Sequence, residues 1–368
     1  MGNRIHVGLL FGGRSCEHEV SVTSAQSVLA AIDRNKYDVT LVGIDKAGQW
    51  CLVDDTEALF ARGWVDSAGL SPVTLDPQRR TLLIQVRDGY RPLDDRALDV
   101  VVPILHGPFG EDGTIQGLLE LAGIPYVGAG VVGSAVGMDK EMMKRAFRAE
   151  GLPSVAYDVI RRSAWDADQT EVSDRINGAL RYPLFIKPAN LGSSVGVVRA
   201  DGPNALPGAV EHALEFDYKV IVEEAVAPCR EVECAVLGNE WPEASCLGEI
   251  RPGAEFYSYD AKYADASSEL IIPAELDDAT TAEIRALSLR AFRAVEACGL
   301  SRIDFFIGGP DNSIYLNEIN TLPGFTPISM YPKLWAESGL PYAQLIDRLI
   351  TLALERFAAT RQVRSALE

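Results

Sequence analysis

Positive charge is scarce in this chain. Of its 368 residues, 34 are lysine or arginine and 52 are aspartate or glutamate, which gives a formal net charge of -18. No lysine- or arginine-rich block interrupts this acidic background. Nucleic acids and anionic membrane surfaces are bound through clusters of positive charge, so we expect neither as a partner.

Cysteine, histidine and long apolar runs are scarce as well. The six cysteines are scattered without a C-x-x-C pair, and the chain has four histidines. This pattern argues against a structural zinc site or a disulfide framework, and it fits a reducing cytoplasm. The N-terminal apolar run is too short for a signal peptide, and no run approaches the roughly 18 residues of a membrane span. We therefore expect a soluble, cytoplasmic protein.

The chain does contain alternating strand-like and helical patterns. Its length exceeds what one hydrophobic core usually supports, so we expect two or three domains. The runs IHVGLLFGG, YDVTLVGI and DVVVPIL predict an α/β fold with a doubly wound parallel sheet. The first loop lacks the full G-x-G-x-x-G pattern, which argues against a dinucleotide site. Farther along, GMDKEMMKRAFRAEG predicts a helix, a strand-rich region follows, and a last amphipathic helix is expected from Tyr342 to Ala358.

Two strand-like runs, RIDFFIGG and SIYLNEIN, are joined by a turn-rich segment. Because side chains alternate along a strand, Arg302 and Asp304 share one face. By the same alternation, Leu316, Glu318 and Asn320 share a face of the second run. Carboxylates and carboxamides are hard oxygen ligands that suit Mg²⁺. The alternative, which the spacing leaves open, is the solvated face of an edge hairpin.

The stretch KPANLGSSVG follows a short apolar run and combines a lysine with glycines and serines. Lysine is rare here, with eight lysines against 26 arginines, so Lys187 is a candidate point charge for phosphate. Ser193, Ser194 and the N–H groups nearby could close over that phosphate. A polar hairpin turn is the alternative. Lys140 is a second candidate phosphate ligand, and an exposed helix charge is the alternative for it.

Further candidates lie in loops. His106 in HGPFGEDG follows an apolar strand, where ligands collect in doubly wound sheets, although a loop histidine satisfied by its neighbours is equally consistent. Glu19 in EHEVS lies at a helix start, where capping and the helix dipole also explain it. Gly324 in NTLPGFTPIS is expected in a tight turn that brings its N–H near a ligand. The segment 255–265, EFYSYDAKYAD, is expected to form a mobile lid or an ordinary aromatic loop.

Together, seven motifs closely resemble those of the D-alanine:D-alanine ligases of the ATP-grasp superfamily. They are LFGGRSCEHEVS, LHGPFGEDGTIQG, GMDK, FIKPANLGSSVGV, EFYSYDAKY, RIDFF and NEINTLPGFTPIS, in that order. The resemblance covers essentially the whole chain. It implies an ATP-grasp fold with an N-terminal Rossmann-like substrate domain (1–129), a central subdomain (130–223) and a C-terminal subdomain that carries the metal site and the lid (224–368).

The resemblance also implies an ATP site between the central and C-terminal subdomains, with KPANLGSSVG as a loop over the phosphates. Leu191 replaces an acidic residue of some relatives, so fine contacts of this loop stay open. Two Mg²⁺ ions, for which Mn²⁺ can substitute, would be bound by Asp304, Glu318 and Asn320. The residues implied to bind the nucleotide are Lys140, Lys187, Ser194, Glu223, the backbone at Ala225 and Val226, and Glu231.

In such ligases the carboxylate of a first D-alanine takes the γ-phosphate of ATP, and the amine of a second D-alanine attacks the acyl phosphate. Carried over, Glu19 would bind the first ammonium and form a hydrogen-bonded group with Ser193 and Tyr263. His106 would lie beside the first substrate. The presence of Tyr263 favours the dipeptide over a D-alanyl-D-lactate product.

Other residues would act on the reacting groups. Arg302 and the N–H of Gly324 would stabilise the oxyanion of the tetrahedral intermediate. Ser329 would receive the second D-alanine, and Lys262 on the lid would receive the moving phosphate. Closure of the site would exclude water from the acyl phosphate. The resemblance also implies a homodimer that serves peptidoglycan precursor synthesis.

Three alternatives differ in class. A ligase that accepts a 2-hydroxy acid as second substrate is disfavoured by Tyr263. A nucleotide-binding module without turnover predicts damage among Asp304, Glu318 and Asn320, and none is visible. A dehydrogenase built on the N-terminal sheet is disfavoured by its incomplete glycine pattern.

Overall fold

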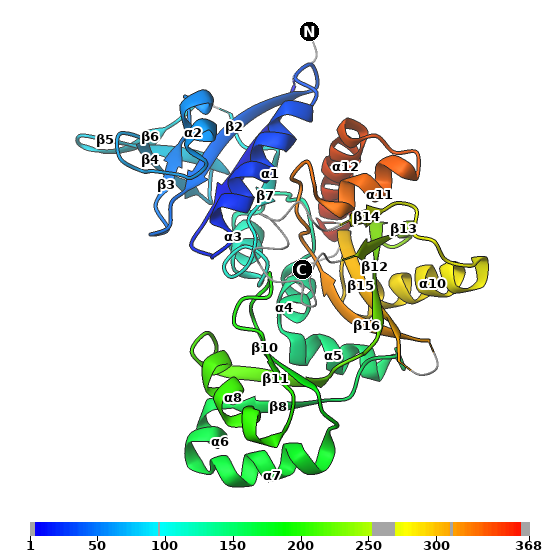
Figure 1. Cartoon of the computed structure of the whole chain (residues 1–368). Coiled ribbons are helices and arrows are strands. Elements are labelled where there is room, and N and C mark those ends of the chain that lie inside the picture. The colour runs from blue at the N-terminus through cyan, green and yellow to red at the C-terminus, as the bar shows by residue number, and fades with distance from the viewer. Residues whose placement is uncertain (1–3, 95, 252–268, 310–311, 362–368) are drawn as a thin grey trace, which may run out of the picture.

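The computed structural model describes residues 4–94, 96–251, 269–309 and 312–361. Over these residues the strands form three sheets, of seven, four and five strands, with helices packed against them (Figure 1). The expected α/β class is confirmed. Within these ranges, no helix has both the length and the apolar character to span a bilayer.

The seven-stranded sheet is mixed. At its centre, β1 (Ile5–Gly12) pairs in parallel with β2 (Tyr37–Ile44) and β7 (Val100–Ile104). The other strands extend the sheet beyond β2 as an antiparallel meander, so the predicted parallel arrangement holds only for β2, β1 and β7. The meander consists of β3 (Trp50–Leu52), β4 (Ser71–Asp76), β5 (Thr81–Val86) and β6 (Gly89–Pro92).

Helices cover both faces of the parallel strands. On one face, α1 (His18–Ala31), the short α2 (Thr56–Arg62) and the C-terminal α12 (Tyr342–Arg361) share a core with alternate residues of β1. On the other face, α3 (Thr114–Ala122) packs with Leu10 and the residues beside it. The carboxyl ends of β1 and β7 therefore open toward the loops that carry Glu17 and His106, as ligand-binding loops do in such sheets.

The four-stranded sheet is antiparallel and has the order β10-β9-β11-β8. Among the described residues, its core is formed by residues between Ile160 and Val222. The strands are β8 (Tyr157–Arg161), β9 (Leu184–Pro188), β10 (Val198–Ala200) and β11 (Lys219–Glu224). The helices are α6 (Arg162–Ala167), α7 (Gln169–Ala179), the 3-10 turn η1 (Pro203–Ala205) and α8 (Leu206–Leu214).

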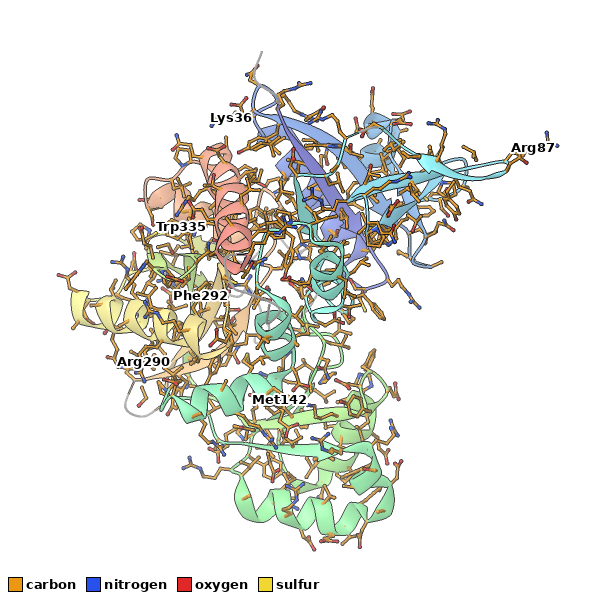
Figure 2. All side chains as sticks on the ribbon, turned by 180° about the vertical axis from the view of Figure 1, so that it is seen from behind. Lys36, Arg87, Met142, Arg290, Phe292 and Trp335 are labelled. Carbon is orange, nitrogen blue, oxygen red and sulfur yellow. The ribbon has the colours of Figure 1, made fainter. Side chains whose placement is uncertain are left out.

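The five-stranded sheet has the order β14-β13-β12-β15-β16, with every pairing antiparallel. On one face α10 (Asp278–Ala294) buries residues such as Phe292, which is labelled in Figure 2. On the other face α11 (Met330–Glu337) buries Trp335 in the core that it shares with α12. The strands are β12 (Cys229–Gly238), β13 (Glu243–Arg251), β14 (Glu269–Ile271), β15 (Gly299–Gly308) and β16 (Ser313–Asn320).

The predicted helix GMDKEMMKRAFRAEG is divided in two. Its first residues end α4 (Val131–Met138), and α5 runs over Lys140–Ala149. The break occurs because Asp139 is extended and its carboxylate accepts the N–H of Met142, so Asp139 caps a new helix. Met143 and Phe147 of α5 pack in the core of the five-stranded sheet, although α5 precedes the four-stranded sheet along the chain.

The expected hairpin is present as β15 and β16, but one face assignment was wrong. Asp304 pairs with Glu318 and Phe305 with Leu316, so a β-bulge leaves Asn317 without a partner position. Leu316 is consequently buried in the core with Phe305, and Glu318 lies on the opposite face. Regular alternation along β16 would have put the two side chains on the same face.

Candidate active site

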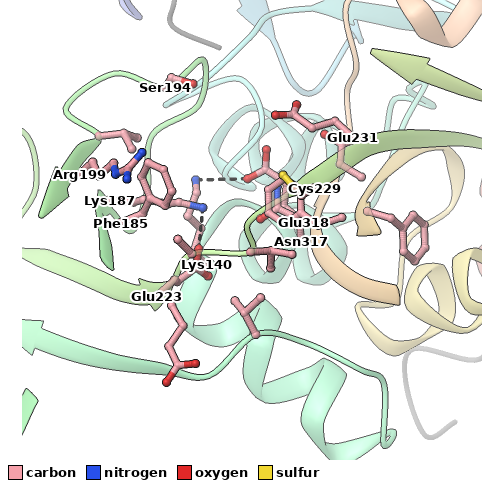
Figure 3. Close-up of a pocket in the computed structure, with 18 of the residues that line it drawn as sticks. Lys140, Phe185, Lys187, Ser194, Arg199, Glu223, Cys229, Glu231, Asn317 and Glu318 are labelled. Atoms are coloured by element: carbon pink, nitrogen blue, oxygen red, sulfur yellow. Dashed lines mark ion pairs between the residues drawn. The ribbon is translucent and has the colours of Figure 1, made fainter. Parts of the chain in front are cut away.

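A cavity of about 560 Å³ lies between the four-stranded and five-stranded sheets (Figure 3). Its walls come from β9, the loop after it, β11, the segment after β11, and the strands β12, β15 and β16. Residues from both sheets therefore face one space. The sequence-predicted residues that line it are Lys140, Lys187, Ser193, Ser194, Glu223, Ala225, Val226, Glu231, Asp304 and Glu318.

One carboxylate at this cavity is shared by two lysines. Glu223 Oε2 lies 2.5 Å from Lys187 Nζ, and Glu223 Oε1 lies 2.7 Å from Lys144 Nζ. Burial alone would raise the pKa of Glu223, but the two ammonium groups outweigh it and hold the pKa at about 2. Sequence reasoning missed Lys144; its position four residues after Lys140 on the same helix was the available signal.

Lys140 connects the loop after β9 to the β15–β16 hairpin. Its Nζ donates to the carbonyl of Leu191 at 2.6 Å and lies 3.8 Å from Glu318 Oε2. Figure 3 shows Lys140 and Lys187 pointing into the same part of the cavity, opposite Glu318. Two positive side chains and a carboxylate thus surround a space that suits the phosphates of a nucleotide with its cation.

The loop that contains Ser193 and Ser194 has a constrained backbone. These two serines have φ angles of 50° and 58°, in the left-handed region that non-glycine residues rarely occupy. Gly196 follows with φ 69°, and a Cβ there would lie 2.7 Å from the ring of Phe216 and 2.8 Å from Pro188. Only glycine fits at position 196, so it anchors the loop to the sheet.

The segment that follows β11 also lines the cavity. The N–H of Ala225 donates to the carbonyl of Pro183 at 2.9 Å, so this amide already has a partner. Phe185 and Val155 also line the cavity and add apolar surface; Phe185 begins the motif FIKPANLGSSVGV, but neither residue was among the predicted site residues. An apolar slot beside backbone polar groups is the usual environment of a flat heteroaromatic ring.

The predicted metal ligands lie on neighbouring strands. Asp304 and Glu318 face each other across the hairpin, and Arg302 faces Asn320. Asp304 and Glu318 line the cavity, whereas Asn320 lies beyond its wall and accepts the N–H of Leu322 at 3.1 Å. In the described ranges no set of three or more histidine, cysteine, aspartate or glutamate side chains is arranged to hold a metal.

Arg302 lies between two carboxylates. Its Nε and Nη2 each donate to Asp304 at 2.7 Å, and its Nε also lies 3.1 Å from Glu233 Oε2. Burial opposes the guanidinium charge, but the carboxylates of Asp304 and Glu233 outweigh it and raise the pKa of Arg302 well above its ordinary value. Glu233 was not among the predicted residues; it faces Asp304 from β12.

The predicted pairing of Glu19 with Ser193 is wrong. The hydroxyl of Ser193 donates to Glu17, and Glu19 instead forms an ion pair of 2.5 Å with Lys46 at the surface. Glu17 precedes α1 as its N-cap residue and has non-helical backbone angles, whereas Glu19 lies in the first turn of the helix, so the two carboxylates meet different partners.

The carboxylate of Glu17 lies in a narrow space between two glycines. A Cβ at Gly107 would lie 3.1 Å from Glu17 Oε2, and a Cβ at Gly192 would lie 3.2 Å from the same atom. Glu17 is 8% exposed, and its backbone N–H donates to the hydroxyl of Ser15 at 3.1 Å. A buried carboxylate between the first sheet and the loop after β9 suits a substrate ammonium group.

His106 is a satisfied loop residue in this structure. Its Nδ1 donates to the carbonyl of Leu322 at 3.1 Å, and its Nε2 lies 3.3 Å from the hydroxyl of Ser24. Burial opposes protonation of His106, but Glu111 and Glu17 outweigh it and raise the pKa of the imidazole above its ordinary value. His106 therefore attaches the first sheet to the loop that follows β16.

That loop also contains Gly324 and Ser329. A Cβ at Gly324 would lie 2.9 Å from Ser329 Oγ, so the two residues lie close together, but the turn of this loop is at Pro327 and Ile328 and not at Gly324 as predicted. Ser329 Oγ accepts the N–H of Thr326 at 3.0 Å, and the N–H of Phe325 donates to Ser24 at 3.2 Å. The loop is thus fixed to α1 at the edge of the site.

Two predicted residues, Lys262 and Tyr263, lie outside the described residues, as does the whole predicted lid 255–265. Their roles stay predictions.

Comparison with known proteins gives a consistent picture. The family model described as D-ala D-ala ligase N-terminus matches residues 6–129, and that described as D-ala D-ala ligase C-terminus matches residues 146–351. The D-alanine--D-alanine ligase of Ruminiclostridium cellulolyticum is 49% identical over 97% of each chain. The protein of the same name from Caldicellulosiruptor bescii is 45% identical over 99% of each chain.

Solved structures agree with these sequence matches. The D-alanine-D-alanine ligase from Coxiella burnetii superposes with a TM-score of 0.84 at 36% identity, covering 98% of this chain and 97% of that one. The VanG D-Ala:D-Ser ligase from Enterococcus faecalis also gives 0.84 and 36%, covering 95% of this chain and 100% of that one. The fold alone therefore does not separate relatives that differ in their second substrate.

Proposed function

The chain belongs to the D-alanine–D-alanine ligase family, and we propose on that basis that it joins two D-alanines into D-alanyl-D-alanine at the expense of ATP. The resemblance expected from its motifs is confirmed by relatives that match it along nearly their whole length. Within the cell it would supply peptidoglycan precursor synthesis, as a homodimer in the cytoplasm.

One observation carries the assignment of the reacting site. Lys140 and Lys187 from one side, and Asp304 and Glu318 from the other, line a single cavity. Phosphoryl transfer depends on positive charge around the moving group, and this arrangement supplies it from the lysines and from any cation that the carboxylates hold. The apolar surface of the cavity near Ala225 would hold adenine.

In the first step, an oxygen of the D-alanine carboxylate attacks the γ-phosphorus, and the bond from that phosphorus to the β-phosphate oxygen breaks to release ADP. Glu17 is proposed to hold the ammonium of this first D-alanine, in place of Glu19. Lys140, Lys187 and Ser194 would hold the phosphates. The carboxylate needs this activation because an unmodified carboxylate is a poor electrophile.

In the second step, the amine of another D-alanine attacks the acyl carbon and phosphate leaves. Negative charge develops on the carbonyl oxygen, and Arg302 with the N–H of Gly324 would stabilise it. Ser329, which lies close to Gly324, would receive the second D-alanine. His106 would act indirectly here, because its bond to the carbonyl of Leu322 fixes the loop that presents Gly324.

The donor set fits a hard divalent cation. Asp304 and Glu318 offer carboxylate oxygens and Asn320 an amide oxygen, the ligands that Mg²⁺ or Mn²⁺ prefers over zinc. These residues would hold two Mg²⁺ ions, which lower the negative charge of the phosphates during transfer. Arg302 is the counter-ion of Asp304 in this structure, and Glu233 offers it a second partner.

The test is ADP release by the purified protein with ATP and Mg²⁺, comparing D-alanine with L-alanine and identifying the product by mass. Release that requires D-alanine and yields its dipeptide is expected. D-lactate and D-serine in competition would reveal a different second substrate, and Tyr263→Phe is expected to increase the share of D-lactate product. ADP release without dependence on D-alanine would contradict the proposed reaction, and sedimentation would test the dimer.

A further inference from the structure

Lys144 has no role in the proposed reaction, yet it has an unusual environment. Its side chain is 1% exposed, and among the described residues it is one of the largest fully buried side chains. A buried lysine costs folding free energy unless a carboxylate compensates its charge. Glu223 provides that carboxylate at 2.7 Å, and the carbonyl of Asn317 lies 3.4 Å from the same ammonium group.

The other ammonium group on Glu223 belongs to a residue with different access. Lys187 lines the cavity and is 15% exposed, whereas Lys144 is absent from the cavity wall. With Glu223 ionised and both lysines protonated, the three side chains carry two positive charges and one negative charge. Only Lys187 can change its partner to an anion in the cavity, because Lys144 is enclosed between α5, β11 and β16.

A change of partner by Lys187 has an electrostatic consequence. When its ammonium group turns toward a phosphate, it withdraws from a carboxylate that is 3% exposed. A buried carboxylate that loses its only counter-ion is strongly destabilised. If a second ammonium group stays on the same carboxylate, that penalty is avoided and Lys187 is released at little cost.

We propose that Lys144 is a positioning residue. Its ammonium group balances the negative charge of Glu223 from outside the cavity, so that Lys187 can leave Glu223 and bind the nucleotide phosphates. This inference rests on the proposed nucleotide site and adds a residue to it. This role explains why Glu223 has two lysine partners, of which Lys187 is accessible from the cavity and Lys144 is not. It also gives Glu223 a role as the resting partner of Lys187, besides any contact with adenine or ribose.

The test is a double-mutant cycle between Lys144→Met and Glu223→Gln, read as the affinity for a non-hydrolysable ATP analogue with Mg²⁺. With Glu223 intact, Lys144→Met is expected to raise the Kd of the analogue about 10- to 100-fold, because Lys187 stays on Glu223. In the Glu223→Gln background the same substitution is expected to change Kd less than about threefold, because a neutral amide needs no counter-ion.

A matched control is Lys219→Met. Lys219 is another buried lysine, with a side chain that is 4% exposed and ion pairs to Asp139 and Glu141, but it does not line the cavity. Its effect on Kd is expected to be the same in both backgrounds. Circular dichroism would check that each variant is folded. If Lys144→Met does not fold, Lys144→Gln, which keeps a neutral donor for Glu223, carries the same comparison.

The results distinguish a failure of the proposed role of Lys144 from a failure of the proposed nucleotide site. An equal loss of affinity from Lys144→Met in both backgrounds would mean that Lys144 acts only on stability, and the proposal would be overturned. A wild-type protein that does not bind the analogue at all would instead overturn the nucleotide site itself.

Discussion

At the scale of single residues, the site depends on which of two nearby carboxylates faces it. Glu17 and Glu19 are both in the motif CEHEVS, and the motif alone does not say which one faces the substrate. The structure separates them by environment: Glu17 is buried against Ser193, and Glu19 pairs with Lys46 at the surface. Exposed ion pairs contribute about 1 kcal/mol or less to folding, so loss of the Glu19–Lys46 pair should have little effect on stability.

We therefore predict that Glu17→Gln lowers kcat/KM for D-alanine about 100-fold, the usual order for loss of a charged group that acts on a bound substrate. Glu19→Gln, the matched control, should change it less than about threefold. Steady-state kinetics at varied D-alanine would decide. A larger loss in Glu19→Gln than in Glu17→Gln would contradict the assignment.

A second prediction concerns the pH dependence of His106. Its pKa is raised above the ordinary value of 6.5, so the charged imidazole stabilises the folded chain fully below that pH, and the contribution is lost as the pH rises through the folded pKa. Glu111→Gln removes a carboxylate that opposes the effect of burial, so the pKa of His106 should fall.

An NMR titration of the His106 ring, assigned with His106→Gln, measures this shift directly. In the wild-type protein, the contribution of His106 to the free energy of unfolding should be larger at about pH 6 than at about pH 8.5. In Glu111→Gln this difference between the two pH values should be smaller. An unchanged His106 pKa in Glu111→Gln would show that Glu111 is not the cause.

At the scale of elements, two local departures from regular structure shape the cavity. The β-bulge at Asn317 puts Leu316 into the core while Glu318 stays on the cavity side. The loop after β9 places consecutive residues in the left-handed region and returns to the sheet at Gly196. Both features position polar groups at the cost of regular pairing, which is typical of functional sites.

The loop gives a prediction about Gly196→Ala. Its positive φ and the 2.7 Å approach to Phe216 leave no room for a methyl group, so the free energy of unfolding should fall by about 2 kcal/mol. Displacement of the loop should also weaken nucleotide binding. Gly208→Ala in α8 is the matched control, because nothing lies within 4 Å of its added Cβ, and it should not destabilise the protein.

Denaturant unfolding and analogue titration would measure both effects. Wild-type stability in Gly196→Ala would mean that the loop has another conformation in solution.

At the scale of the whole molecule, the three sheets are joined unequally. The seven-stranded and five-stranded sheets share one apolar core through α12, and Lys36 and Arg356 add polar contacts between α12 and the N-terminal part of the chain. The four-stranded sheet has a separate core. The cavity lies between the four-stranded and five-stranded sheets, which have separate apolar cores. A ligand bound there would contact both sheets and stabilise their arrangement.

Ligand binding should therefore raise the melting temperature. With ADP and Mg²⁺ at about 100 times their apparent Kd, the folded state gains about 2.7 kcal/mol. Removal of Mg²⁺ by a chelator should reduce this gain. In Glu318→Gln the shift produced by ADP should be nearly the same with and without Mg²⁺, and turnover should be abolished. A full Mg²⁺ effect in this variant, measured by thermal denaturation, would contradict the metal assignment.

The sequence determined the fold class, the order of the motifs and the residue types of the site. These properties could be predicted because glycine-rich turns, strand periodicity and rare lysines are local features, which can be recognised within a short stretch of chain. Lys140, Lys187, Asp304 and Glu318 were all chosen in this way, and all line one cavity.

Only the tertiary structure decided which carboxylate faces which partner. Glu17 meets Ser193 across 176 positions of sequence, Lys144 meets Glu223 between α5 and β11, and Glu233 meets Arg302 between two strands. Such choices depend on helix rotation, on a single bulge and on the packing of distant segments. Each of these turns a side chain toward or away from the site without changing the local pattern; the spacing of Lys144 from Lys140 shows that the two share a helix face, but it does not identify Glu223 as the partner.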